Sequence, residues 1–194
     1  MKLSLIAAAL LHPFLERMLP LSPHTVSLFL SDTGRQEIVK EVADLPGCDA
    51  ILLLDGAEAV PPEGLAADDT PLILPRVHNG VALLLGGSEP YRKLFLQYEG
   101  RICWQAAGSD EPVFPVPQGD CACLCYLADT ALGIPDTGLQ ARAYAQRHGL
   151  DFFEVETDLS LLRRLLSGDW ETPDILRIMP GQAVRAGFTR ELFG

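Results

Sequence analysis

The sequence predicts an α/β fold in which residues 1–194 form a single domain with a mostly parallel, twisted sheet flanked by helices. Short runs rich in Leu, Ile, Val and Phe alternate with longer segments of helical period, which is typical of strands that helices cover on both faces. A chain of 194 residues has the length of one ordinary domain. Its 48% hydrophobic and 21% charged residues exclude intrinsic disorder of the whole chain.

Seven apolar runs are the clearest strands of this sheet. Their apolar residues are continuous rather than alternating with polar ones, so we expect them to be buried on both faces. An eighth run, 101–105, is a weaker candidate. In chain order the seven are residues 3–8, 25–30, 50–54, 72–74, 122–127, 152–155 and 175–178.

Between the strands, capping residues mark the starts of helices. Thr33 and, three positions later, Gln36 resemble a capping box. Further helices are predicted over 136–149 and 158–168, because each segment opens with an aspartate that can cap the first turn and closes with a glycine. In the second of them, leucines recur at the spacing of one helical face.

Two longer stretches, 55–70 and 106–120, are irregular. Loops of more than about 12 to 15 residues are uncommon in α/β domains and are often functional. The first stretch is rich in acidic residues and follows a strand end, which is where open α/β sheets bind ligands. It is either a ligand-binding loop or a solvated acidic connection. The second stretch contains three prolines and is expected to be a rigid surface excursion.

The charge balance limits the partners. A formal net charge of −11 disfavours nucleic acid and anionic membranes. No apolar stretch approaches the roughly 20 residues that span a bilayer. Residues 1–11 have the charge and the apolar run of a secretory signal, but no polar cleavage region follows, so an opening strand explains them better. The odd count of five cysteines indicates a reducing compartment, and we expect a cytoplasmic protein.

Several signatures of known chemistry are absent. The sequence has no G-x-G-x-x-G, no G-x-x-x-x-G-K-[ST], no G-x-S-x-G and no H-E-x-x-H. The expected sheet is therefore Rossmann-like without the dinucleotide fingerprint. Walker nucleotidases, standard α/β-hydrolases and zincins also lose support.

The turn after the strand over 72–74 carries the main candidate site. Arg76 and His78 emerge at the carboxyl edge of that strand, and Asn79 can cap a short helix whose free amide groups point to the same place. Guanidinium, imidazole and amides together favour an anion or a coordinated ligand. The alternative is that His78 is a hydrogen-bonded core residue and Arg76 a surface ion-pair partner.

Other polar residues extend this candidate site. Ser88 is expected to cap a second helix that has Tyr91 in its first turn, and Asp55 opens the acidic loop after another strand. We expect ligand contacts from the whole set, namely Arg76, His78, Asn79, Asp55, Ser88 and Tyr91.

A second candidate site is the run of Cys121, Cys123 and Cys125. On a strand these side chains point to one face about 6.8 Å apart, a separation that does not favour a disulfide between neighbours. Two of them could share a soft metal ion, zinc or iron, with a histidine or cysteine from elsewhere. Burial as ordinary core residues is the alternative.

Segments spread over most of the chain resemble the family catalogued as domain of unknown function 1638, found in anaerobic bacteria and methanogenic archaea. The resemblance implies an association with corrinoid-dependent methyltransferases, without an established reaction. It also implies a metal ion or a corrinoid-related ligand as the bound group. The segments that carry it are 48–56, the 75–80 turn with 83–88, Asp129-Thr130, 161–170 and Pro180-Gly181.

The chain departs from the family pattern where relatives have cysteines. Alanines at 7–9 stand near the first position, Gly56-Ala57-Glu58 replaces a Gly-Leu-Cys turn, and Asn79-Gly80 replaces Asp-Cys after His78. If those cysteines bind metal in relatives, the resemblance leaves His78 with Glu58 or Asp55 here. The cysteine strand can substitute only if it borders the same cleft. The candidate metal ligands are therefore His78, Glu58, Cys121, Cys123 and Cys125.

Three functional hypotheses stay open. The first is an accessory protein that binds a small molecule, an anion or a metal at the Arg76 and His78 turn and works with a partner protein of corrinoid-dependent methyl transfer. The second is an enzyme in which His78 is the general acid or base and Arg76 stabilises an anionic substrate. The third is a divergent interaction module that has lost the site, with a homo-oligomer as one form of it.

Overall fold

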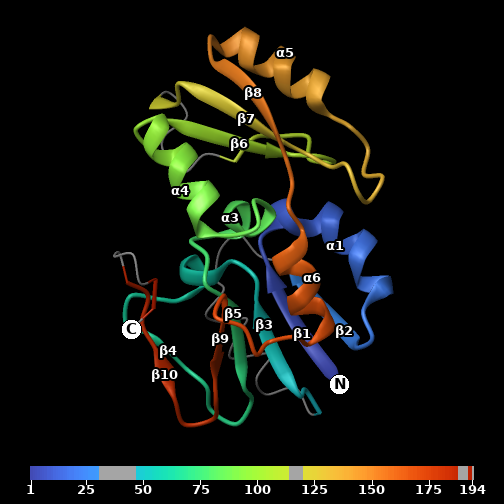
Figure 1. Ribbon diagram of the computed structural model, residues 1–194, viewed down its shortest axis with the longest axis vertical. Helices are drawn as coiled ribbons and strands as arrows, with labels where there is room; N and C mark the ends of the chain where they lie inside the picture. The colour runs from blue at the N-terminus through green and yellow to red at the C-terminus, as the bar shows by residue number, and fades with distance from the viewer. Residues whose placement is uncertain (31–46, 114–119, 188–191, 194) are drawn as a thin grey trace.

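The main strands of the protein form two sheets that follow one another along its longest axis (Figure 1). The computed structural model describes residues 1–30, 47–113, 120–187 and 192–193. Helices flank both sheets, so the predicted α/β class is confirmed. The sequence did not indicate that the strands would separate into two groups, because the apolar runs of both sheets look alike.

The larger sheet has five strands in the order β2-β1-β3-β5-β9. The first four run parallel, and β9 is antiparallel to β5. The antiparallel edge strand is supplied by the last part of the chain. The strands are β1 (Lys2–Ala7), β2 (Thr25–Leu30), β3 (Ala50–Leu53), β5 (Leu72–Pro75) and β9 (Ile175–Ile178).

The second sheet is entirely parallel, with the order β6-β7-β8. Its strands are β6 (Ile102–Ala106), β7 (Cys123–Ala128) and β8 (Asp151–Glu156). A short antiparallel pair lies beside the larger sheet and joins β4 (Leu65–Ala66) to β10 (Ala183–Val184). The loop after β3 is therefore tied to the carboxyl-terminal segment.

Five α-helices and three short 3-10 helices lie in the described ranges. None of these helices is both long and apolar enough to cross a membrane. The α-helices are α1 (His12–Met18), α3 (Gly80–Leu84), α4 (Ser88–Gln97), α5 (Gly138–His148) and α6 (Ser160–Ser167). The 3-10 helices are η1 (Ala9–Leu11), η2 (Leu19–Leu21) and η3 (Gly56–Ala59).

Most of the predicted helix starts are found. The Asn79 side chain accepts a hydrogen bond from the backbone N of Ala82 over 3.1 Å. Asp158 and Asp136 accept from the first helical amides of α6 and α5, but each lies one residue before the cap position. Ser88 is different, because Gly87 is the cap of α4 and the Ser88 hydroxyl donates instead to the carbonyl of Arg76 over 2.9 Å. The capping box at 33–36 lies outside the described residues.

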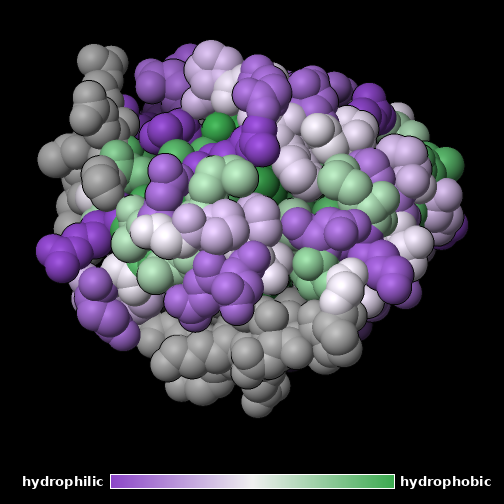
Figure 2. Space-filling view, turned by 90° about the horizontal axis from the view of Figure 1, so that it is seen from below, coloured by the Kyte–Doolittle hydropathy of each residue, from purple (hydrophilic) through white to green (hydrophobic). Residues whose placement is uncertain are grey.

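One hydrophobic cluster connects the two sheets. It contains Leu5 of β1, Trp104 of β6 and Leu162 of α6, which are all at most 1% exposed. Because side chains alternate along a strand, the neighbouring residues Ile6 and Ile51 belong to a second cluster on the opposite face of the larger sheet. Seen from below, the end of the molecule that holds the larger sheet carries hydrophilic residues mixed with small hydrophobic patches (Figure 2).

Candidate functional site

The order of the strands marks one place in the larger sheet where a ligand is expected. The chain leaves β1 for β2 on one side and then crosses back to β3 on the other side of β1. In open α/β sheets, ligands bind in the crevice outside the carboxyl ends of two strands related in this way. Here those ends lead into η1 and η3.

A cavity of about 460 Å³ lies at this point, and we call it the switch-point cleft. Loops after three strands of the larger sheet form one side, and the segment after β6 of the smaller sheet forms the other. The cleft is therefore lined by both sheets. Its lining residues are Ala8, Ala9, Leu10, Asp55, Glu58, Asn79, Gly80, Val81, Ser109, Glu111, Pro112 and Val113.

The charge of the cleft comes from three carboxylates, Asp55, Glu58 and Glu111. Asp55 is 1% exposed, whereas the two glutamates are on the surface. None of the described residues that line the cleft is Lys, Arg or His. A cleft with this lining attracts cations and repels anions.

Backbone hydrogen bonds hold the acidic loop against the turn after β5. The amides of Ala57 and Glu58 donate to the carbonyls of Val77 and His78 over 2.9 and 3.0 Å. Gly56 makes this approach feasible, because its φ is +56° and a Cβ there would lie 2.3 Å from the carbonyl oxygen of Val77. The loop after β3 and the turn after β5 are thereby held side by side at the cleft.

The remaining wall is fixed by contacts to β6. Val113 and Trp104 exchange backbone hydrogen bonds, and the side chain of Gln105 donates to the carbonyl of Ser109 over 2.8 Å. This segment carries Glu111 into the cleft. The sequence had indicated only a rigid excursion here, and the pairing of Val113 with Trp104 is a long-range contact that no local pattern reveals.

An aromatic stack supports the cleft from inside the core. Tyr91 of α4 lies 5.2 Å from the His78 ring and 5.5 Å from the Trp104 ring, measured between centroids. Asn79 donates a side-chain hydrogen bond to the Tyr91 hydroxyl over 3.2 Å. Burial raises the pKa of Tyr91, so its hydroxyl keeps its proton. Tyr91 and Ser88 do not line the cleft.

His78 lines a neighbouring cavity of about 450 Å³, which we call the His78 pocket. Glu58 lines both this pocket and the switch-point cleft. Burial, followed by the positive charge of Arg92, lowers the pKa of His78 from its ordinary value of 6.5. The imidazole is therefore mostly neutral at neutral pH. The other lining residues are Ala57, Val60, Pro62, Ala186, Gly187 and Leu192.

The structure places Arg76 and His78 in the linings of two different cavities and not in one shared pocket. The backbone amide of Arg76 donates to the carbonyl of Asp174 over 2.7 Å, next to the antiparallel strand β9. The Arg76 guanidinium lies 6.0 Å from the ring of Phe193 and lines a separate cavity with Leu176 and other residues of that edge. Buried Val77 separates the two side chains along the chain.

The candidate metal ligands are not gathered. The described part of the chain has no group of three or more His, Cys, Asp or Glu side chains that could hold a metal ion. Cys121, Cys123 and Cys125 are at most 6% exposed. Burial raises the pKa of Cys123 to about 11 and raises the pKa of Cys121 and Cys125, which disfavours thiolate ligands. The structure therefore favours the alternative that these cysteines are ordinary core residues.

Of the predicted contact residues, Asp55, Asn79 and Glu58 line the switch-point cleft. Residues 8–10, Ser109 and Glu111 also line it and were not among the contact residues predicted from the sequence. Their signal was position alone, because 8–10 directly follow the first strand. Comparisons of the chain with protein-family models, with curated proteins and with solved structures find no match.

Proposed function

We propose that this protein binds a small organic cation, such as a substituted ammonium ion, in the switch-point cleft. The proposal rests on the cleft at the switch point between β1 and β3. Three carboxylates line this cleft, and none of its described lining residues is basic. Small-molecule sites are concave and have a few placed polar groups, and the volume of about 460 Å³ lies in their usual range.

The position of the carboxylates favours an ammonium group over a fully solvated metal ion or an anion. Asp55 is buried directly after the carboxyl end of β3, where Coulomb attraction is screened less than in bulk water. Asn79 and Ser109 add neutral polar groups to the wall. A ligand that combines one positive charge with hydrogen-bonding groups matches this lining.

The resemblance to the domain of unknown function 1638 family supports a role beside corrinoid-dependent methyl transfer. In this proposal the protein is an accessory binding protein that holds a cationic substrate or product for a partner enzyme. Anion binding at Arg76, the version expected from the sequence, is not supported because Arg76 lines a different cavity.

The test is a calorimetric titration with butylammonium, putrescine and tetramethylammonium, compared with butanol and butyrate. We expect binding of at least one cation and no binding of butyrate. Glu58→Gln and Glu111→Gln each remove one charge from the cleft and weaken binding, by about three- to tenfold per charge. Asp110→Asn removes an exposed charge next to Glu111 that does not line the cleft and serves as the matched control.

The outcomes separate cleanly. Equal weakening by Asp110→Asn and Glu111→Gln would mean that only the overall charge of −11 attracts the cation. Failure of every cation to bind, or preferential binding of butyrate, would contradict the proposal.

A second candidate function is acid–base catalysis in the His78 pocket. His78 and Glu58 line the same cavity, and the buried Nδ1 of His78 has no hydrogen-bond partner among the described residues. A neutral imidazole that lines a cavity can accept a proton from a substrate bound there. The test is an NMR titration of His78, whose midpoint should lie below 6.5 and rise in Arg92→Gln. An imidazole that does not titrate above about pH 4 contradicts this role.

A further inference from the structure

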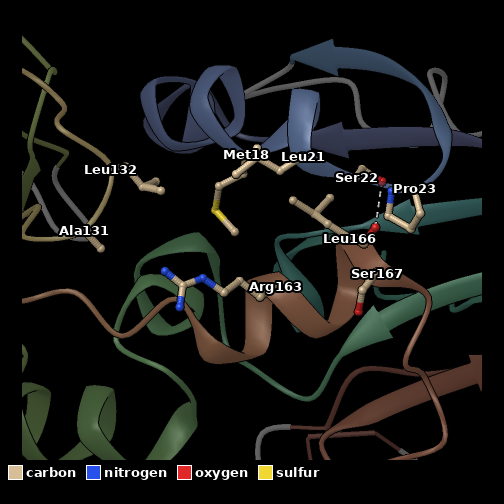
Figure 3. A pocket seen from close by; sticks show the side chains of 9 residues that line it. All are labelled: Met18, Leu21, Ser22, Pro23, Ala131, Leu132, Arg163, Leu166 and Ser167. Atoms are coloured by element: carbon tan, nitrogen blue, oxygen red, sulfur yellow. Dashed lines mark hydrogen bonds between the residues drawn. The ribbon is translucent and has the colours of Figure 1, made fainter.

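A further cavity, of about 360 Å³, lies away from the switch-point cleft and shares no lining residue with it (Figure 3). It is a groove between α6 and the segment that joins α1 to β2, and the loop after β7 closes one end. We propose that this groove binds an aliphatic monocarboxylate, with the apolar chain in the groove and the carboxylate on Arg163. We call it the Arg163 groove.

The body of the groove is apolar. Met18 and Leu166 form its floor and are at most 5% exposed, whereas Leu21 at its edge is 77% exposed. Figure 3 shows that Met18 and Leu166 point into the space between the two segments. An aliphatic chain in the groove covers mainly the exposed side chain of Leu21 and thereby removes apolar surface from water, at about 25 cal/mol per Å². Pro23, Ala131 and Leu132 complete the apolar lining.

The polar side chains of the groove leave one hydrogen-bond donor for a ligand. The Ser22 hydroxyl donates to the carbonyl of Leu166 over 2.8 Å, and the Ser167 hydroxyl donates to the carbonyl of Arg164 over 3.1 Å. Both serine protons are therefore used within the protein. Arg163 is the remaining lining residue with N–H groups on its side chain.

Arg163 is placed to meet an anion at the end of the groove. Its side chain is exposed, and Figure 3 shows its guanidinium extending from α6 toward the loop that carries Ala131 and Leu132. Among the described residues Arg163 forms no ion pair within 4.0 Å, whereas its neighbour Arg164 pairs with Asp174 at 3.1 Å. Hydrogen bonds from Ser160, and after them the charge of Arg163, lower the pKa of Asp158, but no ion pair within 4.0 Å joins Arg163 to that carboxylate among the described residues.

The loop opposite Arg163 is held in one conformation. The carboxylate of Asp129 accepts hydrogen bonds from the amides of Ala131, Leu132 and Ile134 over 2.8 to 3.1 Å. These amides are thus occupied, and they do not compete with Arg163 for an anion. A rigid wall, an apolar floor and a single cation at one end match a molecule with a flexible chain and one carboxylate.

The charge of the ligand distinguishes this groove from the switch-point cleft. The cleft has three carboxylates and attracts cations, whereas the groove presents one guanidinium. The two sites therefore take ligands of opposite sign. The groove does not depend on the function proposed for the cleft.

The experiment is a calorimetric titration of the full chain with octanoate. We expect one site, and we expect Arg163→Gln to weaken octanoate binding by about tenfold or more. Arg164→Gln removes one positive charge from the adjacent position of the same helix and should change the affinity less than twofold. Octanamide, which keeps the chain but has no charge, should bind as weakly to the wild type as octanoate binds to Arg163→Gln.

A second measurement locates the ligand. In amide NMR spectra, octanoate should shift the signals of Leu132 and Leu166 and leave those of Asn79 and Glu111 unchanged. Leu132→Asp should abolish binding with no loss of fold in circular dichroism, because Leu132 is only half-buried. The proposal is overturned by equal affinity of Arg163→Gln and wild type, by equal loss in Arg164→Gln, by equal binding of octanamide, or by shifts confined to the switch-point cleft.

Discussion

Asn79 and Tyr91 form a side-chain hydrogen bond of 3.2 Å that joins the turn after β5 to α4. The same asparagine accepts the amide of Ala82 and so caps α3. One side chain thereby fixes a wall of the switch-point cleft and the aromatic stack that leads to Trp104.

Replacement of Asn79 should therefore lower the stability in two ways that different variants can separate. We expect Asn79→Ala to lower the free energy of unfolding by about 2 kcal/mol, since it removes a helix cap and a partner of a buried hydroxyl. Asn79→Ser keeps a capping oxygen and should lose about 1 kcal/mol. Adding Tyr91→Phe to Asn79→Ala should restore little of the free energy of unfolding that Asn79→Ala loses. Urea unfolding measures all three, and equal stability of Asn79→Ala and Asn79→Ser would contradict the capping role.

Gly56 should tolerate no side chain. In Gly56→Ala the new Cβ would lie 2.3 Å from the Val77 carbonyl oxygen, so the two loops under the cleft must separate. We expect a loss of unfolding free energy at least about 2 kcal/mol larger than in Gly133→Ala. Gly133 is the matched control because its φ is +67° and nothing lies within 4 Å of its would-be Cβ. Thermal denaturation of both variants decides, and similar midpoints would rule out the close contact.

His78 should make stability depend on pH below its ordinary pKa of 6.5. Burial and then Arg92 lower the pKa of the folded state, so the unfolded chain takes up a proton first as the pH falls. The contribution of His78 is fully present above 6.5 and is lost as the pH drops through the lower folded value. Asp136 and Asp158, whose carboxylates accept hydrogen bonds, change the stability only at lower pH, because their ordinary pKa is 3.8.

The measurement is urea unfolding at about pH 8 and about pH 5.5 for the wild type and His78→Gln. The wild type should lose more stability than His78→Gln between these two conditions. Parallel losses in the two proteins would show that His78 keeps its ordinary pKa in the folded state.

The cysteines should differ in their reactivity. Cys103 and Cys123 are buried, and burial raises their pKa to about 12 and about 11, so little thiolate forms near neutral pH. We expect iodoacetamide to modify the half-buried Cys48 first and to reach the other four only after unfolding. Mass spectrometry of peptides from native and urea-unfolded protein measures this order. Modification of Cys123 as fast as Cys48 in the native protein would contradict it.

The elements of the fold could be predicted because their signals are local. The runs at 25–30 and 175–178 have the bounds of β2 and β9. The cap at Asn79 and the hydrogen bond from the Ser160 amide to Asp158 depend on atoms only a few residues apart. The helix α1 was missed, although Phe14, Leu15 and Met18 recur at helical spacing. The division into two sheets depends on which strands pair, and the composition of a strand does not encode that choice.

The candidate site could be predicted only in part for the same reason. Asp55 and Asn79 were found because they follow strands at the carboxyl edge. The direction of Arg76 depends on its amide bonding to Asp174, near the other end of the chain. The presence of Glu111 in the cleft depends on Val113 pairing with Trp104. Neither contact leaves a pattern in the surrounding residues.

The single cluster that contains Leu5, Trp104 and Leu162 has a mechanical consequence. Proteins with two domains joined by a hinge can close over a ligand. In this protein, separation of the two sheets would expose Trp104 and the stacked Tyr91 to water. The shared core therefore opposes a change in the width of the cleft. If the proposed cation binds there, we expect its capture to be governed by diffusion and by the long-range field of the acidic surface rather than by a closing motion.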